Sequence, residues 1–140
     1  LMLGGIEVPA DKGLLGHSDA DVLLHASIDA LLGAAGVGER GELFPDTDKK
    51  YKGISSNILM DKAARLIKGR KYRIGNIDAV IVLEKPKLSK FKKKMEENIA
   101  RVLNISKNKV NVKAKTNEGL DAVGEGRAIA AYAVAVILEV

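Results

Sequence analysis

The 140-residue sequence contains no cysteine, no tryptophan, only two histidines and 4% aromatic residues. The absence of cysteine excludes disulfide bonds and thiol chemistry, and it fits a cytoplasmic enzyme. The longest apolar run, Ala128 to Leu138, is too short to cross a bilayer, so no membrane partner is expected. The few aromatic residues are not interleaved with basic ones, which argues against a stacking platform for nucleic acid.

Apolar residues make up 46% of the sequence and charged residues 29%, a balance typical of a soluble globular chain. At this length we expect a single domain over residues 1–140. The net charge of +5 is partly local, because six lysines lie within ten residues: Lys85, Lys87, Lys90, Lys92, Lys93 and Lys94. A solvated helix face is the commoner explanation of such a cluster, and a phosphate-facing patch is the alternative.

Segments with strand and helix patterns alternate along the chain. Apolar runs and period-two alternation predict strands over residues 1–8 (interrupted by two glycines), 77–83, 110–114 and 128–140. Helical spacing predicts helices over residues 19–35 and 57–68, and a third that Ser89 caps. This order predicts an α/β fold of the two-layer α+β kind, a mixed four-stranded sheet with helices on one face. The apolar last strand also predicts that self-association covers the other face.

The segment GLLGHSDADVLLHASIDALLGAAG contains both histidines, His17 and His25. Ser18 followed by Asp21 has the form that opens a helix, on which Asp21, His25 and Asp29 recur every four residues. A carboxylate one turn away can orient a metal-ligating imidazole. A surface ion pair is the commoner reason for this spacing, and one histidine cannot hold zinc alone, because a catalytic site needs about three protein ligands.

Five strings occur in order along the chain: GHSDADVLLHASIDALLGAAG, LFPDTD, IGNIDA, EKPK and VKAKTNEGL. Together they closely resemble the 2-C-methyl-D-erythritol 2,4-cyclodiphosphate synthase family, and the match covers essentially the whole sequence. The resemblance implies a homotrimer with active sites between subunits. It also implies a phosphorus–oxygen lyase of the non-mevalonate isoprenoid pathway, which converts 4-diphosphocytidyl-2-C-methyl-D-erythritol 2-phosphate to the cyclic diphosphate and CMP.

The resemblance implies two metal ions. His25 matches the family's helical zinc ligand, and the other two ligands, in an Asp-x-His motif, are expected upstream of Leu1. Because the match begins inside a strand, we expect that motif to be missing from this sequence rather than lost from the protein. Glu118 matches the residue that holds a second divalent cation, magnesium or manganese.

The resemblance also implies roles for individual residues. His17 and Ser18 match the loop that engages the 2-phosphate, although Ser18 is equally explained as a helix cap, and Thr116 matches a catalytic residue near the diphosphate. Asp21 and Asp29 match structural or supporting acids. The residues implied to bind substrate are Gly41 and Asp46 at the methylerythritol end, Lys87 and Leu88 at the cytidine diphosphate end, and Ala114, Lys115 and Glu118.

The sequence departs from the family pattern at several positions. Glu39 replaces a common aspartate, and Lys115 replaces a common threonine, so their roles are open. Glu125 and Arg127 are exchanged relative to the commoner order, which favours a structural ion pair. The connection over residues 36–53 is long for a structureless segment, and we expect it to be mobile and to close over bound substrate.

Two other functions are compatible with the sequence. A catalytically inert trimer could keep the nucleotide or phosphate pocket without zinc. A basic nucleic-acid-binding domain would account for the lysine cluster, but no other feature supports it. Fusion to an upstream cytidylyltransferase is a further arrangement that the sequence leaves open.

Overall fold

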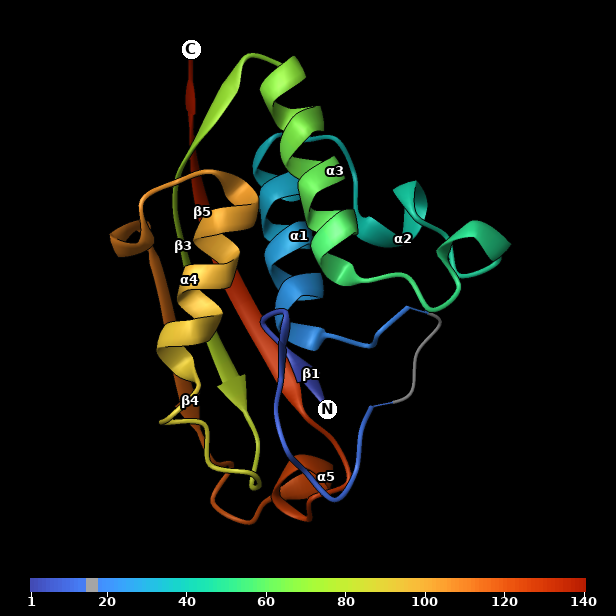
Figure 1. The fold of residues 1–140 in the computed structure, drawn as a ribbon, viewed down its shortest axis with the longest axis vertical. Coiled ribbons are helices and arrows are strands. Elements are labelled where there is room, and N and C mark those ends of the chain that lie inside the picture. Colours follow the sequence, from blue (N-terminus) through green and yellow to red (C-terminus); the bar gives the residue numbers. More distant parts are fainter. Residues whose placement is uncertain (15–17) are drawn as a thin grey trace.

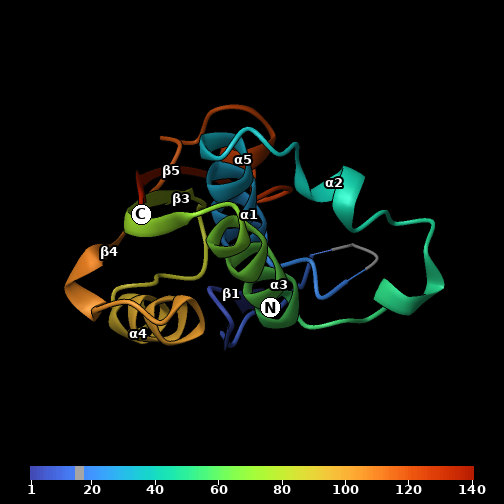
Figure 2. The ribbon, with the colours of Figure 1, turned by 90° about the horizontal axis from the view of Figure 1, so that it is seen from above.

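A three-stranded sheet forms one layer of the computed structural model, which describes residues 1–14 and 18–140, and three helices form the other (Figures 1 and 2). The sheet contains β3 (Tyr72–Val82), β4 (Val110–Lys115) and β5 (Ala130–Glu139), in the order β4-β3-β5. The helices α1 (Val22–Ala34), α3 (Ser56–Gly69) and α4 (Lys92–Leu103) lie on one face of it. The expectation of a mixed sheet with helices on one face is therefore confirmed.

The central strand, β3, pairs in parallel with β4 and antiparallel with β5. Its last residue, Val82, lies opposite Lys115 on one side and Ala130 on the other. The carboxyl ends of β3 and β4 therefore meet at the same edge of the sheet, where ligands commonly bind in sheets of this kind.

The expectation of a fourth strand in this sheet is wrong. Residues 1–8 form a separate antiparallel hairpin, in which β1 (Met2–Leu3) pairs with β2 (Ile6–Glu7). Gly4 and Gly5 both have positive φ angles, of 62° and 76°, and turns of this kind reverse the chain within two residues. The two glycines therefore end the strand that the apolar pattern alone appeared to continue.

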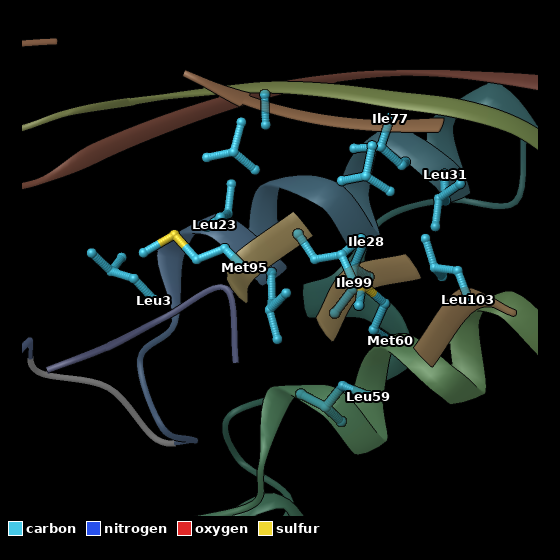
Figure 3. Close-up of a cluster of buried hydrophobic side chains, with 14 of the residues drawn as sticks. Leu3, Leu23, Ile28, Leu31, Leu59, Met60, Ile77, Met95, Ile99 and Leu103 are labelled. Carbon is cyan, nitrogen blue, oxygen red and sulfur yellow. The ribbon is translucent and has the colours of Figure 1, made fainter. Parts of the chain in front are cut away.

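The hydrophobic core lies between the sheet and the three helices (Figure 3). Apolar residues at helical spacing on α1, α3 and α4 point toward one another and toward β3, and Leu3 of the hairpin joins them. The buried side chains labelled in Figure 3 are Leu3, Leu23, Ile28, Leu31, Leu59, Met60, Ile77, Met95, Ile99 and Leu103. Burial of each contributes about 1.5–3 kcal/mol.

Two predicted helix starts need correction. The third helix begins at Lys92 with Phe91 as its N-cap, and not at Ser89, because the Leu88 carbonyl accepts hydrogen bonds from the amides of both Phe91 and Lys92. The second helix extends one residue beyond the prediction at each end, and Ser55 caps it by accepting from the Asn57 amide. No described helix outside residues 15–17 is long and apolar enough to span a membrane.

The segment of residues 36–53 is more ordered than its composition predicts. It contains the short helix α2 (Arg40–Leu43) and a 3-10 turn, η1 (Lys49–Tyr51). Phe44 and Tyr51 are buried and meet edge to face, with ring centroids 5.6 Å apart. These two aromatic side chains anchor the segment in the core, while its mobility and its closure over substrate stay predictions.

The strand β5 has two unlike faces. Ala131, Ala133 and Ala135 are half-buried, and the last two pack against the core beneath the helices. Tyr132 and Val134 point away, with 65% and 69% of their surface exposed, and Val136 continues the same apolar row. Small inward side chains let α1 approach the sheet closely, and the large apolar ones form an uncovered surface.

The remaining two elements are short. The 3-10 turn η2 (Lys107–Lys109) leads from α4 into β4. The one-turn helix α5 (Asp121–Gly124) lies between β4 and β5 at the edge of the sheet where β3 and β4 end (Figure 1).

Candidate active site

Helix α1 begins later than its sequence pattern predicts. Its N-cap is Asp21, whose Oδ1 accepts a hydrogen bond of 3.0 Å from the Leu24 amide. Ala20 has a φ of 58°, in the left-handed region, so a right-handed helix cannot continue back through it. The prediction that Ser18 opens the helix is therefore wrong, and the Ser18 side chain is available for another role.

The Asp21 carboxylate is fully buried and structural. Its oxygens also accept from the amides of Gly4 and Gly5, at 2.9 and 2.7 Å, which fastens the N-terminal hairpin to the start of α1. Burial raises the pKa of this carboxyl group, whereas the three backbone amides favour its charged form. Its oxygens accept from backbone amides, so of the two roles expected for Asp21 the structural one agrees with these hydrogen bonds, and not support of the His25 imidazole.

Among the described residues, the side chains that hydrogen-bond to the His25 imidazole are serines. Its Nε2 lies 2.8 Å from the Ser56 hydroxyl oxygen and 3.2 Å from that of Ser18. The Ser56 hydroxyl donates a 2.5 Å hydrogen bond to Asp19, whose other oxygen accepts from the Ser56 amide. We call Ser18, Asp19, His25 and Ser56 the histidine cluster. Because the Ser56 proton is directed to Asp19, its oxygen accepts from Nε2–H, which leaves the imidazole lone pair on Nδ1.

The His25 imidazole is neutral at pH 7. Burial lowers its pKa from 6.5 to about 4, and the positive charge of Arg40 acts in the same direction. The carboxylates of Asp19, Asp29 and Asp46 oppose this shift without overcoming it. A neutral imidazole keeps a lone pair for a metal ion or a proton.

The other residues predicted for the methylerythritol end lie close to this cluster in the fold. Gly41 is in α2, Glu39 is the N-cap of that helix, and Asp46 follows it closely enough to influence the charge of His25. Asp29 holds α2 against α1 by accepting a 2.7 Å hydrogen bond from the Arg40 amide, a structural role. His17, which is predicted to be catalytic, lies outside the described residues.

The histidine cluster does not form a complete zinc site by itself. Across residues 1–14 and 18–140, no group of three or more histidine, cysteine, aspartate or glutamate side chains is placed to hold a metal ion. His25 supplies one nitrogen donor, and a zinc site needs about three protein ligands.

The second group of predicted residues lines a cavity of about 200 Å³ at the carboxyl ends of β3 and β4. We call it the carboxyl-end pocket. Five residues predicted from the resemblance are among its walls: Lys87, Leu88, Ala114, Lys115 and Thr116. The structure adds Leu83, Glu84, Pro86, Ser89 and Lys92. The loop after β3 and the end of β4, distant in sequence, thus form one site.

Hydrogen bonds hold the two sides of this pocket together. The Leu83 amide donates to the Lys115 carbonyl at 3.0 Å. The Glu84 carboxylate accepts a 2.7 Å hydrogen bond from the Asn117 amide and so fixes the loop after β4. Glu118, the predicted cation ligand, is exposed in that loop rather than in the pocket wall.

The expected ion pair between Glu125 and Arg127 is present. Arg127 Nη2 lies 2.7 Å from Glu125 Oε2, and both side chains are exposed. The Arg127 amide also donates to the Ala122 carbonyl, so the pair lies on a tight turn after α5. Its role is structural at this level.

Helix α2, with Gly41, and the carboxyl-end pocket lie on opposite sides of α1, which itself carries His25. In both views of the ribbon, α2 is on one side of this helix and α4 and β4 are on the other (Figures 1 and 2). One copy of the chain therefore separates Gly41 from the carboxyl-end pocket.

Four functional candidates were missed at the level of sequence. Asp19 and Ser56 are distant in the sequence and contact each other in the fold. The sequence hints at a role only through the position of Asp19 beside Ser18 and that of Ser56 at the start of a helix. Glu84 is in the EKPK string and Lys92 is in the lysine cluster. Both line the pocket, but the sequence does not distinguish them from the charged residues around them.

Known proteins resemble this chain in sequence and in fold. The family model described as the YgbB family matches residues 1–138. A 2-C-methyl-D-erythritol 2,4-cyclodiphosphate synthase from Clostridium novyi is 53% identical over 139 residues, which cover 99% of this chain and 88% of that protein.

Solved structures show the same fold. A bifunctional IspDF from Campylobacter jejuni is 38% identical with a TM-score of 0.96, over 100% of this chain and 38% of that chain. This chain thus spans well under half of that bifunctional protein. An IspF from Plasmodium falciparum, in complex with CDP, is 36% identical with a TM-score of 0.87, over 99% of this chain and 83% of that one.

Proposed function

The chain belongs to the YgbB family of 2-C-methyl-D-erythritol 2,4-cyclodiphosphate synthases, enzymes of isoprenoid biosynthesis, and on this premise we propose how its two groups of residues share one substrate. The carboxyl-end pocket binds the cytidine diphosphate part of 4-diphosphocytidyl-2-C-methyl-D-erythritol 2-phosphate. The histidine cluster, with Gly41 and Asp46, binds the methylerythritol 2-phosphate part.

One observation carries this proposal. Four residues that the resemblance assigns to substrate binding and one that it assigns to catalysis come from two parts of the sequence and line one cavity: Lys87, Leu88, Ala114 and Lys115, with Thr116. Lysine ammonium groups and a threonine hydroxyl suit phosphate, and apolar Leu88 and Ala114 suit a base. The related protein from Plasmodium falciparum was solved with CDP, which has this chemistry.

The separation of the two groups supports a homotrimer with sites between subunits. The exposed apolar row on β5, with Tyr132, Val134 and Val136, is a surface that self-association would cover. In such an assembly, the pocket of one subunit would face the histidine cluster of the next. Sedimentation equilibrium tests this, since a mass of one chain at micromolar concentration would contradict it.

The reaction needs alignment and charge compensation more than bond-making side chains. The 2-phosphate attacks the β-phosphorus of the same molecule, so one P–O bond forms, the bond to CMP breaks, and the ring closes. Holding both phosphates in line makes an intramolecular displacement fast. Ser18 at the 2-phosphate, and Lys87 and Thr116 at the diphosphate, would supply donors to oxygens that gain charge.

We propose two metal ions on the same grounds. Glu118 fits magnesium or manganese, because one exposed carboxylate together with substrate phosphates is a common way to hold such an ion, which would neutralise charge on the diphosphate. His25 would supply one zinc ligand through its imidazole. The described residues do not supply the other ligands, so no step is assigned to zinc.

Phosphorus NMR tests the function. Protein expressed from its complete reading frame, supplied with zinc and magnesium, is mixed with the substrate, and CMP and the cyclic diphosphate are followed. We expect both products from the unaltered protein and neither from His25→Ala, while a Lys93→Met control on α4 remains active. CDP binding without turnover in the unaltered protein would instead indicate the inert nucleotide-binding trimer.

A further inference from the structure

The lysine cluster is not uniform in the structure. Lys93 and Lys94, in the first turn of α4, are exposed, which is the solvated helix face expected for such a run. Lys92, the first residue of the same helix, is half-buried and lines the carboxyl-end pocket. Adjacent lysines of one sequence run therefore have different surroundings.

Three lysines line this pocket from three places in the chain. Lys87 is in the loop after β3, Lys92 begins α4, and Lys115 ends β4. Within residues 1–14 and 18–140, none of these three ammonium groups forms an ion pair with a carboxylate. The pocket thus holds three positive charges that have no carboxylate partner in the described part of the chain.

One carboxylate also lines the pocket, and it does not neutralise these lysines by contact. The Glu84 carboxylate accepts its hydrogen bond from the Asn117 backbone amide at 2.7 Å. No ammonium group lies within ion-pair distance of it among the described residues. Apolar Leu83, Pro86 and Leu88 form other parts of the wall.

We propose that Lys92 and Lys115 bind phosphate together with Lys87, and that this three-lysine set makes the pocket prefer a nucleoside diphosphate over a nucleoside monophosphate. The proposal rests on the proposed function, since it concerns the same pocket. A diphosphate offers one more phosphate group than a monophosphate, and ammonium donors to phosphate form charge-assisted hydrogen bonds. The pocket would therefore hold the diphosphate of the substrate more tightly than the CMP that the reaction releases.

Calorimetric titration with CDP and with CMP tests this on the whole protein. Lys92→Met and Lys115→Met remove the charge and keep most of the apolar stem. We expect each to weaken CDP binding about threefold to tenfold, as removal of a partly exposed charge partner does, and CMP binding by less. Lys93→Met is the matched control, because this neighbouring lysine is exposed and does not line the pocket.

The outcomes distinguish this proposal from the broader one that the pocket binds the cytidine diphosphate part of the substrate. If CDP binds the unaltered protein and both pocket variants bind CDP as tightly as Lys93→Met does, the three-lysine set is wrong and the assignment of the pocket stands. If CDP does not bind the unaltered protein, the assignment of the pocket itself fails. If the lysine variants lose equal affinity for CDP and for CMP, the lysines bind phosphate without preferring the diphosphate, which overturns the proposed selectivity. Raising the salt concentration should reduce the difference in CDP affinity between the unaltered protein and each pocket variant.

Discussion

The histidine cluster and the carboxyl-end pocket differ in whether their polar and charged side chains have partners within the described chain. In the cluster, each polar side chain has a partner within the chain: Ser56 contacts both His25 and Asp19, and Ser18 also contacts His25. In the pocket, Lys87, Lys92 and Lys115 have no carboxylate partner among the described residues. One region is fixed by internal hydrogen bonds, and the other leaves charge for a ligand.

This difference fits the roles proposed for the two regions. A group that handles a metal ion or a developing charge gains from a fixed tautomer and orientation, which internal hydrogen bonds provide. A region that captures a polyanion gains from charges that become paired when the ligand binds. Substitutions in the cluster should therefore act on turnover or folding, and substitutions in the pocket on affinity.

The largest effect is expected at the base of the histidine cluster, from Asp21→Ala. Three backbone amides, of Gly4, Gly5 and Leu24, lose their buried acceptor. We expect the free energy of unfolding to fall by about 2–4 kcal/mol, measured by urea denaturation. Asp29→Ala is the control, because that exposed carboxylate accepts one backbone hydrogen bond. Equal decreases in the free energy of unfolding for the two variants would show that the buried hydrogen bonds of Asp21 contribute no more than the exposed one of Asp29.

Removal of the hydroxyl that contacts His25 should separate turnover from affinity. Ser56→Ala frees the imidazole to rotate and to change tautomer, so we expect kcat to fall about tenfold to hundredfold, the usual cost of losing the partner of a metal-ligating histidine. CDP affinity should be unchanged. Ser55→Ala is the matched control, since Ser55 caps α3 without contacting His25. A Ser56→Ala variant with unaltered kcat would show that the cluster does not position the histidine.

In the pocket, Glu84→Ala should have a smaller effect, on affinity. The Asn117 amide loses its acceptor, so the loop with Thr116 and Glu118 loses one of its fixed points. We expect CDP binding to weaken about threefold to tenfold, the cost of one charge-assisted hydrogen bond. Glu84→Gln keeps an acceptor oxygen and should restore most of the affinity. A Gln variant that binds CDP as weakly as the Ala variant would show that the charge, and not the hydrogen bond, matters.

The last expected effect is a dependence of stability on pH. The His25 pKa falls from 6.5 in an unfolded chain to about 4 in the folded one, mainly through burial. Between these values the unfolded chain binds the extra proton, so the free energy of unfolding should decrease as pH falls from 6.5 toward about 4. NMR titration of the metal-free protein, with His25→Gln for assignment, measures the pKa directly. A midpoint near 6.5 would contradict the burial of this imidazole.

The elements of the fold with strong periodic patterns were predictable, and the turns between them were less so. The apolar spacing identified α3 and β4 within one residue at each end. The start of α1 was misplaced because the left-handed conformation of Ala20 leaves no mark in the sequence. The hairpin was read as part of a longer strand, although Gly4-Gly5 carried the signal for a reversal.

The site was predictable where family strings identify residues, and not where contacts join distant segments. Lys87 and Thr116 come from separate strings, and the pocket brings them together as expected. The contact between Asp19 and Ser56 joins the segment before α1 to the first residue of α3, and it has no local pattern. Lys92 could not be distinguished from Lys93 in the sequence, because its half-buried position depends on how α4 packs beside β4.

Because its walls follow two paired strands, β3 and β4, the pocket exists only in the folded chain. Its walls come from residues 83–89 and 114–116, which are adjacent only after the two strands have paired. An unfolded chain therefore has no equivalent binding site, so CDP bound there as proposed would shift the folding equilibrium toward the native state by mass action. Each tenfold increase in the CDP concentration above its Kd would add about 1.4 kcal/mol to the free energy of unfolding. The melting temperature would then depend on the nucleotide concentration around the protein as well as on its sequence.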